Sequence, residues 1–159
     1  MLGNLQINPQ GIIHSQATAY EATRSHYAKV FSRLAMTAKW RQFCAWLKGS
    51  RRELLNLNAY GQVNGRHYLG VRLVPLAQIT GSEGRAADYD IDFLPRQQHD
   101  EDRWVGVATA RRMGKPMPPV ELVQIGSNYF VRDGHHRISI ARALGELEIE
   151  AEVTRWETN

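Results

Sequence analysis

Apolar side chains recur at helical spacing through the first third of the chain, in two successive stripes. The first stripe is Tyr27, Phe31, Leu34 and Ala38, and the second is Trp40, Phe43, Cys44 and Leu47. Spacings of three and four residues predict α-helix, and Gly49-Ser50 predicts its end. We therefore expect two helices within residues 15–48, with both stripes packed against the protein rather than against a membrane or a cofactor.

The remaining pattern predicts a compact α/β unit. Residues 1–14 show no periodicity, and residues 51–60 suit one more short helix before a turn at 61–65. Further on, loops are expected at residues 81–85 and 88–93, and a hairpin turn at Gly126-Ser127-Asn128. The expected strands are 68–76, 120–125, 129–132 and 148–154, and the expected helices are 99–112 and 134–144. This pattern predicts a basic helical segment at residues 1–66 and an α/β (α+β) domain at 67–159.

The net charge of +4 conceals an asymmetry between the two parts of the chain. Residues 1–72 hold ten Lys and Arg against two Glu, whereas residues 73–159 hold ten against fourteen Asp and Glu. A basic segment of this kind suits nucleic acid, an acidic partner, or the acidic half of its own chain. With a single cysteine, Cys44, no signal-like start and no apolar run long enough to span a membrane, we expect a cytoplasmic protein.

The run Asp133-Gly134-His135-His136-Arg137 joins an apolar strand to a helix within two or three residues. We call residues 133–137 the strand–helix turn. A helix start carries unpaired N–H groups and partial positive charge, and an arginine fork matches phosphate oxygens. Gly134 allows a sharp turn and the close approach of a ligand. The sequence therefore predicts a site for an anion, most simply a phosphate group.

Each residue of the turn also has a structural interpretation. Asp133 is a good helix N-cap, but an acidic residue beside phosphates would also hold Mg²⁺. His135 and His136 point in different directions from one helical turn, so one can donate to a phosphate or act as an acid or base near neutral pH while the other is structural. Arg137 can form a surface ion pair, although its place in the first turn favours the phosphate.

The turn and its surroundings resemble the ParB/sulfiredoxin superfamily. The resemblance covers residues 68–156. Besides the strand–helix turn, the segments that carry it are Val74-Pro75-Leu76, Pro118-Pro119-Val120, and Ala141-Arg142-Ala143-Leu144-Gly145 with the strand after it. It implies a compact mixed sheet with helices. It also implies that the helix behind the turn holds the phosphates of a nucleotide such as ATP, ADP or CTP, together with Mg²⁺.

Departures from the family narrow the function that the resemblance implies. Sulfiredoxins carry a cysteine where this chain has His135, and partition proteins carry a helix-turn-helix domain after the nucleotide site, for which only about a dozen residues remain here. The amino-acid sequence of the strand–helix turn is most similar to that of the branch that resembles free serine kinases. In that branch an acidic loop residue is the implied base, and Glu83 holds the comparable position. Arg85 would supply a second phosphate contact, and the alternative for Glu83 is a solvated loop residue.

Three functions remain compatible with these residues. The first is a nucleotide-dependent phosphotransferase or nucleotide hydrolase, with Glu83 or a histidine as base. The alternative is a nucleotide-switched binding module that contacts DNA or a partner protein through its basic helices. The third is a ParB-type nuclease, for which the acidic run Asp88, Asp90 and Asp92 could bind a metal ion, although this run also suits a solvated loop. A homodimer formed through Trp40 or Trp46 is compatible with each of the three.

Overall fold

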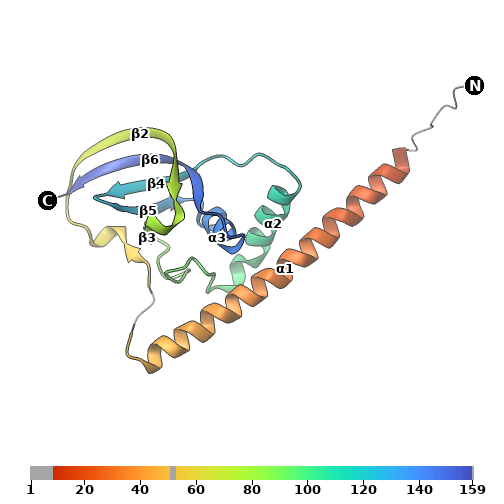
Figure 1. Ribbon diagram of the computed structural model, residues 1–159, viewed down its shortest axis with the longest axis horizontal. Helices are drawn as coiled ribbons and strands as arrows, with labels where there is room; N and C mark the ends of the chain where they lie inside the picture. The colour runs from red at the N-terminus through yellow and green to blue at the C-terminus, as the bar shows by residue number, and fades with distance from the viewer. Residues whose placement is uncertain (1–8, 51–52, 159) are drawn as a thin grey trace, which may run out of the picture.

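The computed structural model describes residues 9–50 and 53–158, with side chains from residue 16 onward. Its first element is one continuous helix, α1 (Pro9–Leu47), which lies along α2 (Glu101–Arg112) and projects beyond the rest of the molecule at its start (Figure 1). The prediction of two helices is therefore wrong, and so is that of a loose start over residues 9–14. Residues 1–8 lie outside the described part. Because neither Gly nor Pro stands between Ile12 and Lys48, the chain contains no helix breaker there.

The two apolar stripes lie on opposite faces of α1. Phe31, from the first stripe, is fully buried and meets the Trp104 ring edge-on, with 5.7 Å between the ring centroids. From the second stripe, Trp40, Phe43 and Leu47 are all exposed. At 100° per residue the second stripe is rotated by about half a turn from the first. The prediction that both stripes pack against the protein is correct for the first stripe and wrong for the second.

Six strands form one mixed sheet with the order β1-β3-β5-β4-β6-β2. Strands β1, β3 and β5 run parallel, as do β4 and β6, whereas the pairs β4–β5 and β2–β6 are antiparallel. The predicted α/β class is therefore confirmed, including the hairpin of β4 and β5. The strands are β1 (Leu55–Asn56), β2 (Val63–Pro75), β3 (Ile79–Ser82), β4 (Val120–Ile125), β5 (Asn128–Asp133) and β6 (Glu148–Thr158).

The segment before β2 is not the predicted helix. It forms β1 and a short 3-10 helix, η1 (Leu57–Ala59), and β1 pairs in parallel with Gly81 and Ser82. That partner is too distant in the sequence for local periodicity to reveal it. The loop expected at residues 81–85 begins only after Ser82, where β3 ends. Strand β2 crosses the expected boundary between residues 66 and 67, and the division into two domains stays a prediction.

Helices α2 (Glu101–Arg112) and α3 (His135–Ala143) lie between the sheet and α1 (Figure 1). One buried cluster joins the sheet to α3 and includes Val131, Val153 and Ile138. A second joins all three helices and includes Phe31, Trp104 and Ile140, so α1 shares an interior with the rest of the fold. Among the described residues no helix combines the length and the apolar character that crossing a membrane requires.

Candidate functional site

The strand–helix turn has the sharp geometry that the sequence predicts. Strand β5 ends at Asp133, α3 begins at His135, and Gly134 between them adopts a left-handed conformation with φ of 95°. A side chain is excluded there by the protein itself, because a Cβ on Gly134 would lie 2.5 Å from Cγ1 of Val120. The expectation that this glycine leaves room for a ligand is therefore wrong.

Three backbone N–H groups at the start of α3 precede its first turn of hydrogen bonds. The first intrahelical bond runs from the N–H of Ile138 to the carbonyl of Gly134, at 3.0 Å. The residue at the N-cap position is Gly134, and no side chain caps the helix, so the interpretation of Asp133 as an N-cap is wrong. The preceding N–H groups and the helix dipole leave this end of α3 suited to an anion.

Arg137 already has partners in the structure. Its Nη2 donates to Oδ2 of Asp133 at 2.6 Å, and its Nη1 donates to the carbonyl oxygens of Pro118 and Pro119. The arginine side chain is 15% exposed, whereas that of Asp133 is 61% exposed. Arg137 thus ties the proline segment before β4 to α3, and among the described residues its anionic partner is the solvent-facing carboxylate of Asp133.

His135 is turned into the protein rather than toward solvent. Its Nε2 lies 2.7 Å from Oγ of Ser82, the last residue of β3, and that oxygen also accepts the N–H of Arg85 at 3.2 Å. Burial, and next the positive charge of Arg85, lower the pKa of His135 to about 4. The imidazole is therefore neutral at pH 7, which disfavours the expected role as an acid or base near neutral pH. Sequence analysis did not single out Ser82.

His136 points the other way, as expected, toward the start of α2. Its Nε2 lies 3.4 Å from Oδ1 of Asp100, and the other oxygen of Asp100 accepts a hydrogen bond from Nη2 of Arg85 at 2.7 Å. Burial lowers the pKa of His136, although the Asp100 carboxylate acts in the opposite direction. Arg85 also donates to Asp88 at 2.7 Å. From the sequence we expected Asp100 only to favour the first turn of a helix. In the structure it is buried, and its carboxylate joins the start of α2 to Arg85 after β3 and to His136 on α3.

Glu83 lies beside the turn, where the sequence placed it. It follows β3 directly, and its N–H donates to the carbonyl of Val131 on β5 at 2.8 Å. Its carboxylate accepts a hydrogen bond from Nε of Arg132 at 2.7 Å, and about a third of each side chain is exposed. Glu83 therefore lies against the end of β5, where the strand–helix turn begins.

The acidic stretch after β3 is occupied by contacts within the protein. Asp88 binds Arg85, Asp92 binds Nη1 of Arg41 at 2.7 Å, and Asp90 accepts the N–H of Asp92 at 2.9 Å. Within the part of the chain that the structure describes, no cluster of three or more His, Cys, Asp or Glu side chains could hold a metal ion. These contacts favour the interpretation as a loop over that as a nuclease metal centre.

Part of the basic segment meets the acidic half of its own chain. Arg41 of α1 pairs with Asp92, and Arg24 of α1 pairs with Asp102 of α2 at 2.8 Å. This was one of the three partners that the charge asymmetry suggested. The other lysines and arginines of α1, Lys29, Arg33 and Lys39, are exposed.

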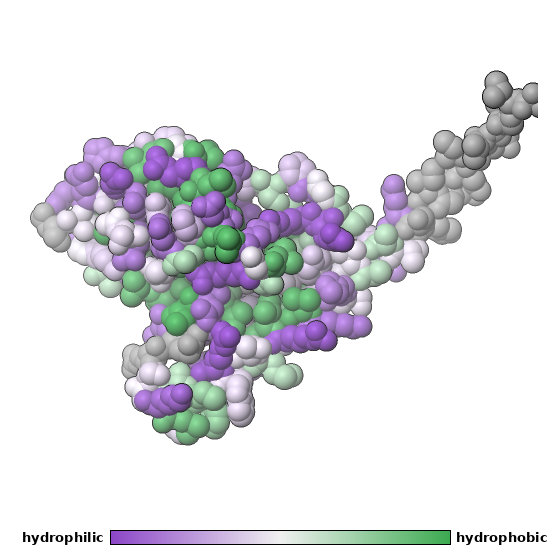
Figure 2. Space-filling model, in the orientation of Figure 1, coloured by the Kyte–Doolittle hydropathy of each residue, from purple (hydrophilic) through white to green (hydrophobic). Residues whose placement is uncertain are grey.

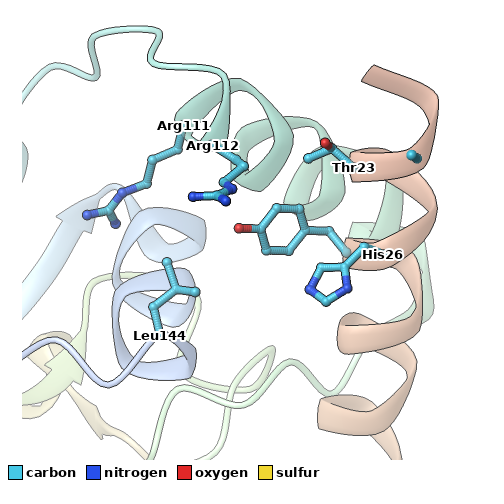
Figure 3. A pocket seen from close by; sticks show the side chains of 7 residues that line it. Thr23, His26, Arg111, Arg112 and Leu144 are labelled. Carbon is cyan, nitrogen blue, oxygen red and sulfur yellow. The ribbon is translucent and has the colours of Figure 1, made fainter. Parts of the chain in front are cut away.

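Of the pockets near α3, one reaches the turn. This pocket, of about 310 Å³, lies beside the proline segment, and its lining includes Arg137, Lys115 and Pro118. A larger hollow of about 710 Å³ opens between the three helices, at the far end of α3 from the turn, and its lining includes Arg111, Arg112 and His26 (Figure 3). None of the site residues predicted from the sequence lines this larger hollow.

Comparisons with known proteins give a structural likeness and no sequence relative. No family model matches the chain, and no curated protein matches it. Among solved structures, the chain is similar to the crystal structure of sulfiredoxin from Arabidopsis thaliana, with 19% sequence identity and a TM-score of 0.36. The match covers 52% of this chain and 82% of the sulfiredoxin chain. At this level of likeness, membership of the ParB/sulfiredoxin superfamily stays a prediction.

Proposed function

We propose that the strand–helix turn binds the phosphate groups of a nucleotide, and that the protein is a nucleotide-dependent phosphotransferase or nucleotide hydrolase. One observation carries this proposal. Arg132 near the end of β5 and Arg137 in the first turn of α3 are each held by a carboxylate that is itself partly exposed, Glu83 and Asp133 respectively. The site therefore pairs cations with anions that an incoming phosphate can replace.

At Arg132 the cost of that exchange is small. The Arg132–Glu83 pair, in which about a third of each side chain is exposed, contributes on the order of 0–1 kcal/mol, because water competes for both charges. A phosphate group offers more negative charge than one carboxylate and several acceptor oxygens for an arginine fork. It would also meet the N–H groups of the first turn of α3, which Glu83 and Asp133 do not use. When a phosphate replaces them, the carboxylates of Glu83 and Asp133 no longer bind arginine and can take other partners.

The released carboxylates suit the two tasks that a bound nucleotide needs. Asp133, 61% exposed, suits Mg²⁺, which binds nucleotides through one or two carboxylates together with phosphate oxygens and water. A bound Mg²⁺ ion would neutralise charge on the phosphates. Glu83, once free of Arg132, can accept a proton from an attacking hydroxyl or water. Arg137 would stabilise charge that develops on the transferred phosphoryl group.

The histidines support this arrangement from behind. His135, neutral and bound to Ser82, fixes the end of β3 against the first turn of α3. Asp100 holds Arg85 and lies against His136, and so fixes the start of α2 in the same place. Because both imidazoles are buried and their pKa values are lowered, we assign the base to Glu83 and a positioning role to His135 and His136.

Calorimetric titration tests the binding half of the proposal. The protein would be titrated with ATP, ADP, CTP and GTP, each with and without Mg²⁺. We expect Arg132→Gln to weaken the nucleotide that binds by about tenfold or more, and Asp133→Asn to remove the effect of Mg²⁺. Asp102→Asn, which removes the same charge from an exposed carboxylate that pairs with Arg24 of α1, is the matched control and should bind like the wild type. Absence of binding by all four nucleotides would refute the proposal.

A turnover assay then tests the chemistry. We expect the wild type to consume the bound nucleotide, and Glu83→Gln to bind it as well as the wild type while losing turnover at least about a hundredfold. If the wild type binds a nucleotide but releases it unchanged in the presence of Mg²⁺, the protein is a nucleotide-switched module rather than an enzyme. Full turnover by Glu83→Gln would show that another group is the base.

A further inference from the structure

The face of α1 that points away from the fold is apolar and basic. We call it the outer face, and it consists of Met36, Trp40, Phe43 and Leu47 with the cations Lys29, Arg33, Lys39 and Lys48, all exposed. The apolar positions are spaced four, three and four residues apart, which places them in one row. No acidic residue stands between Glu21 and Glu53. In Figure 2 hydrophobic (green) atoms lie next to hydrophilic (purple) atoms on the part of the outer face near the end of α1.

A second uncovered face lies on the opposite side of the molecule, over strands β2 and β6. Val71 and Leu73 on β2 stand opposite Glu152 and Glu150 on β6. All four are exposed, and they alternate with the buried Val74, Ala151 and Val153, whose side chains face the core. We call this the open sheet face, and it also includes Tyr68 and Glu148.

The open sheet face is the uncovered part of a surface that the protein elsewhere protects. On the same side of the sheet, Val123 and Phe130 are buried beneath the segment before β2, where the Tyr60 ring meets Phe130 edge-on at 5.0 Å. That cover does not extend over Val71 and Leu73, which are 49% and 66% exposed. Within the described residues none of the glutamates of the open sheet face forms an ion pair.

The two uncovered faces are complementary in charge and in size. The apolar row of α1 spans eleven residues, or roughly 17 Å at 1.5 Å per residue. The stretch of β2 from Tyr68 to Leu73 is also roughly 17 Å at 3.3 Å per residue. Cations border the row on α1, and glutamates border the apolar side chains on the sheet. In Figure 1 helices α2 and α3 lie between the sheet and α1, so α1 cannot reach the open sheet face of its own chain.

We propose that the outer face of α1 packs on the open sheet face of a second copy of this chain. In a two-fold dimer the contact forms twice, and each copy supplies one helix and one sheet. The contact would cover Phe43 and Leu47 with Leu73 and Val71, and would set Lys39 and Lys48 against the glutamates of β6. Nucleic acid could neutralise the lysines, but it would leave the aliphatic side chains and the acidic face without a partner. A second copy accounts for both faces with one contact.

Charge reversal tests this pairing on the full chain. Light scattering after size-exclusion chromatography, over a range of concentrations, would compare the wild type with Lys39→Glu/Lys48→Glu on the helix and with Glu150→Lys/Glu152→Lys on the sheet. We expect the wild type to dimerise and each variant alone to raise the dissociation constant at least about tenfold. An equimolar mixture of the two variants should recover the dimer, because the reversed helix of one meets the reversed sheet of the other. Lys115→Glu/Glu101→Lys is the control.

Several results would overturn the proposal. The first is a wild type that stays monomeric at all concentrations, and the second is a sheet variant that dimerises like the wild type. The third is a mixture of the two variants that remains monomeric although both variants keep the circular dichroism and melting profile of the wild type. A monomeric wild type that retards a single-stranded oligonucleotide, with the retardation lost in the helix variant alone, would instead assign the outer face to nucleic acid. An unchanged sheet variant with a disrupted helix variant would indicate pairing between two α1 helices.

Discussion

His135 makes the stability of this fold depend on pH in a predictable direction. Burial against Ser82 and Tyr89 lowers the pKa of His135 to about 4 from the 6.5 of an exposed imidazole. Between pH 4 and pH 6.5 the imidazole of His135 is protonated in the unfolded chain but neutral in the folded chain, so a lower pH favours unfolding. The stabilisation from a neutral His135 is therefore complete above about pH 6.5, and it is lost as the pH falls from there toward 4.

The size of the effect follows from the same two pKa values. Relative to pH 7.5, protonation of the unfolded state at this position should cost on the order of 1 kcal/mol at pH 5.5 and on the order of 2–3 kcal/mol at pH 4.5. Urea unfolding at these three pH values would measure the loss in the wild type and in His135→Gln, which keeps a hydrogen-bonding group toward Ser82 but does not titrate. Carboxylates also titrate near pH 4.5, but they do so in both proteins and cancel in the difference.

The control for this experiment is a histidine without burial. His26→Gln replaces an exposed imidazole on α1 and should lose stability with acid in the same way as the wild type. If the wild type and His135→Gln lose the same free energy of unfolding between pH 7.5 and 4.5, then His135 is not held neutral in the fold, and its role as a buried support of the site fails.

Three further predictions concern stability. Phe31→Ala should lower the free energy of unfolding in urea by about 3–5 kcal/mol, because it empties the buried contact between α1 and α2, whereas Met36→Ala on the outer face should change it by less than about 0.5 kcal/mol. Gly134→Ala should cost at least about 2 kcal/mol, since it adds a collision to a left-handed backbone, and Gly84→Ala, equally left-handed but in open space, should cost less; equal losses would contradict the packing at the turn. Arg142→Gln should cost about 1.5–3 kcal/mol and speed amide exchange in β3, because Nη2 of Arg142 donates to two carbonyls around the start of that strand; unchanged exchange there would contradict this link.

The elements that the sequence predicted well are those fixed by neighbours along the chain. Gly126 and Ser127 mark the turn of the β4–β5 hairpin, and Gly114 and Gly145 mark the ends of α2 and α3. In each case the signal is a backbone conformation that only a few residues adopt easily, so that it can be recognised without knowledge of the fold. The same holds for Gly134, whose left-handed conformation marks the start of α3.

The errors have a common cause in contacts between distant residues. The change of phase between Ala38 and Trp40 was interpreted as a break between helices, yet it marks a single helix with one side buried and the other exposed. Leu55 suits a helix locally, but it lies in a strand because Gly81 offers a parallel partner. In each case tertiary packing decides what local spacing leaves open.

The sharp strand–helix turn was predicted from the sequence, whereas the residues buried behind it were not. Glu83 lies against the end of β5, next to this turn, and its role as the base, which the resemblance implied, stays a prediction. Ser82 and Asp100 gave no signal, because a serine and an aspartate at element ends usually bind water or cap a helix. What makes them part of the site is burial beside His135 and Arg85, which no sequence pattern expresses.

The position of β6 between β4 and β2 has a consequence for how the chain is made. Strand β2 has no partner in the sheet other than β6, which follows it by more than seventy residues and comes after all the other strands. During synthesis β2 must therefore wait, with its backbone unpaired, until β6 has left the ribosome, although the β4–β5 hairpin can close long before. A nascent chain stalled after α3 would leave β2 as an unpaired strand that could pair with another chain.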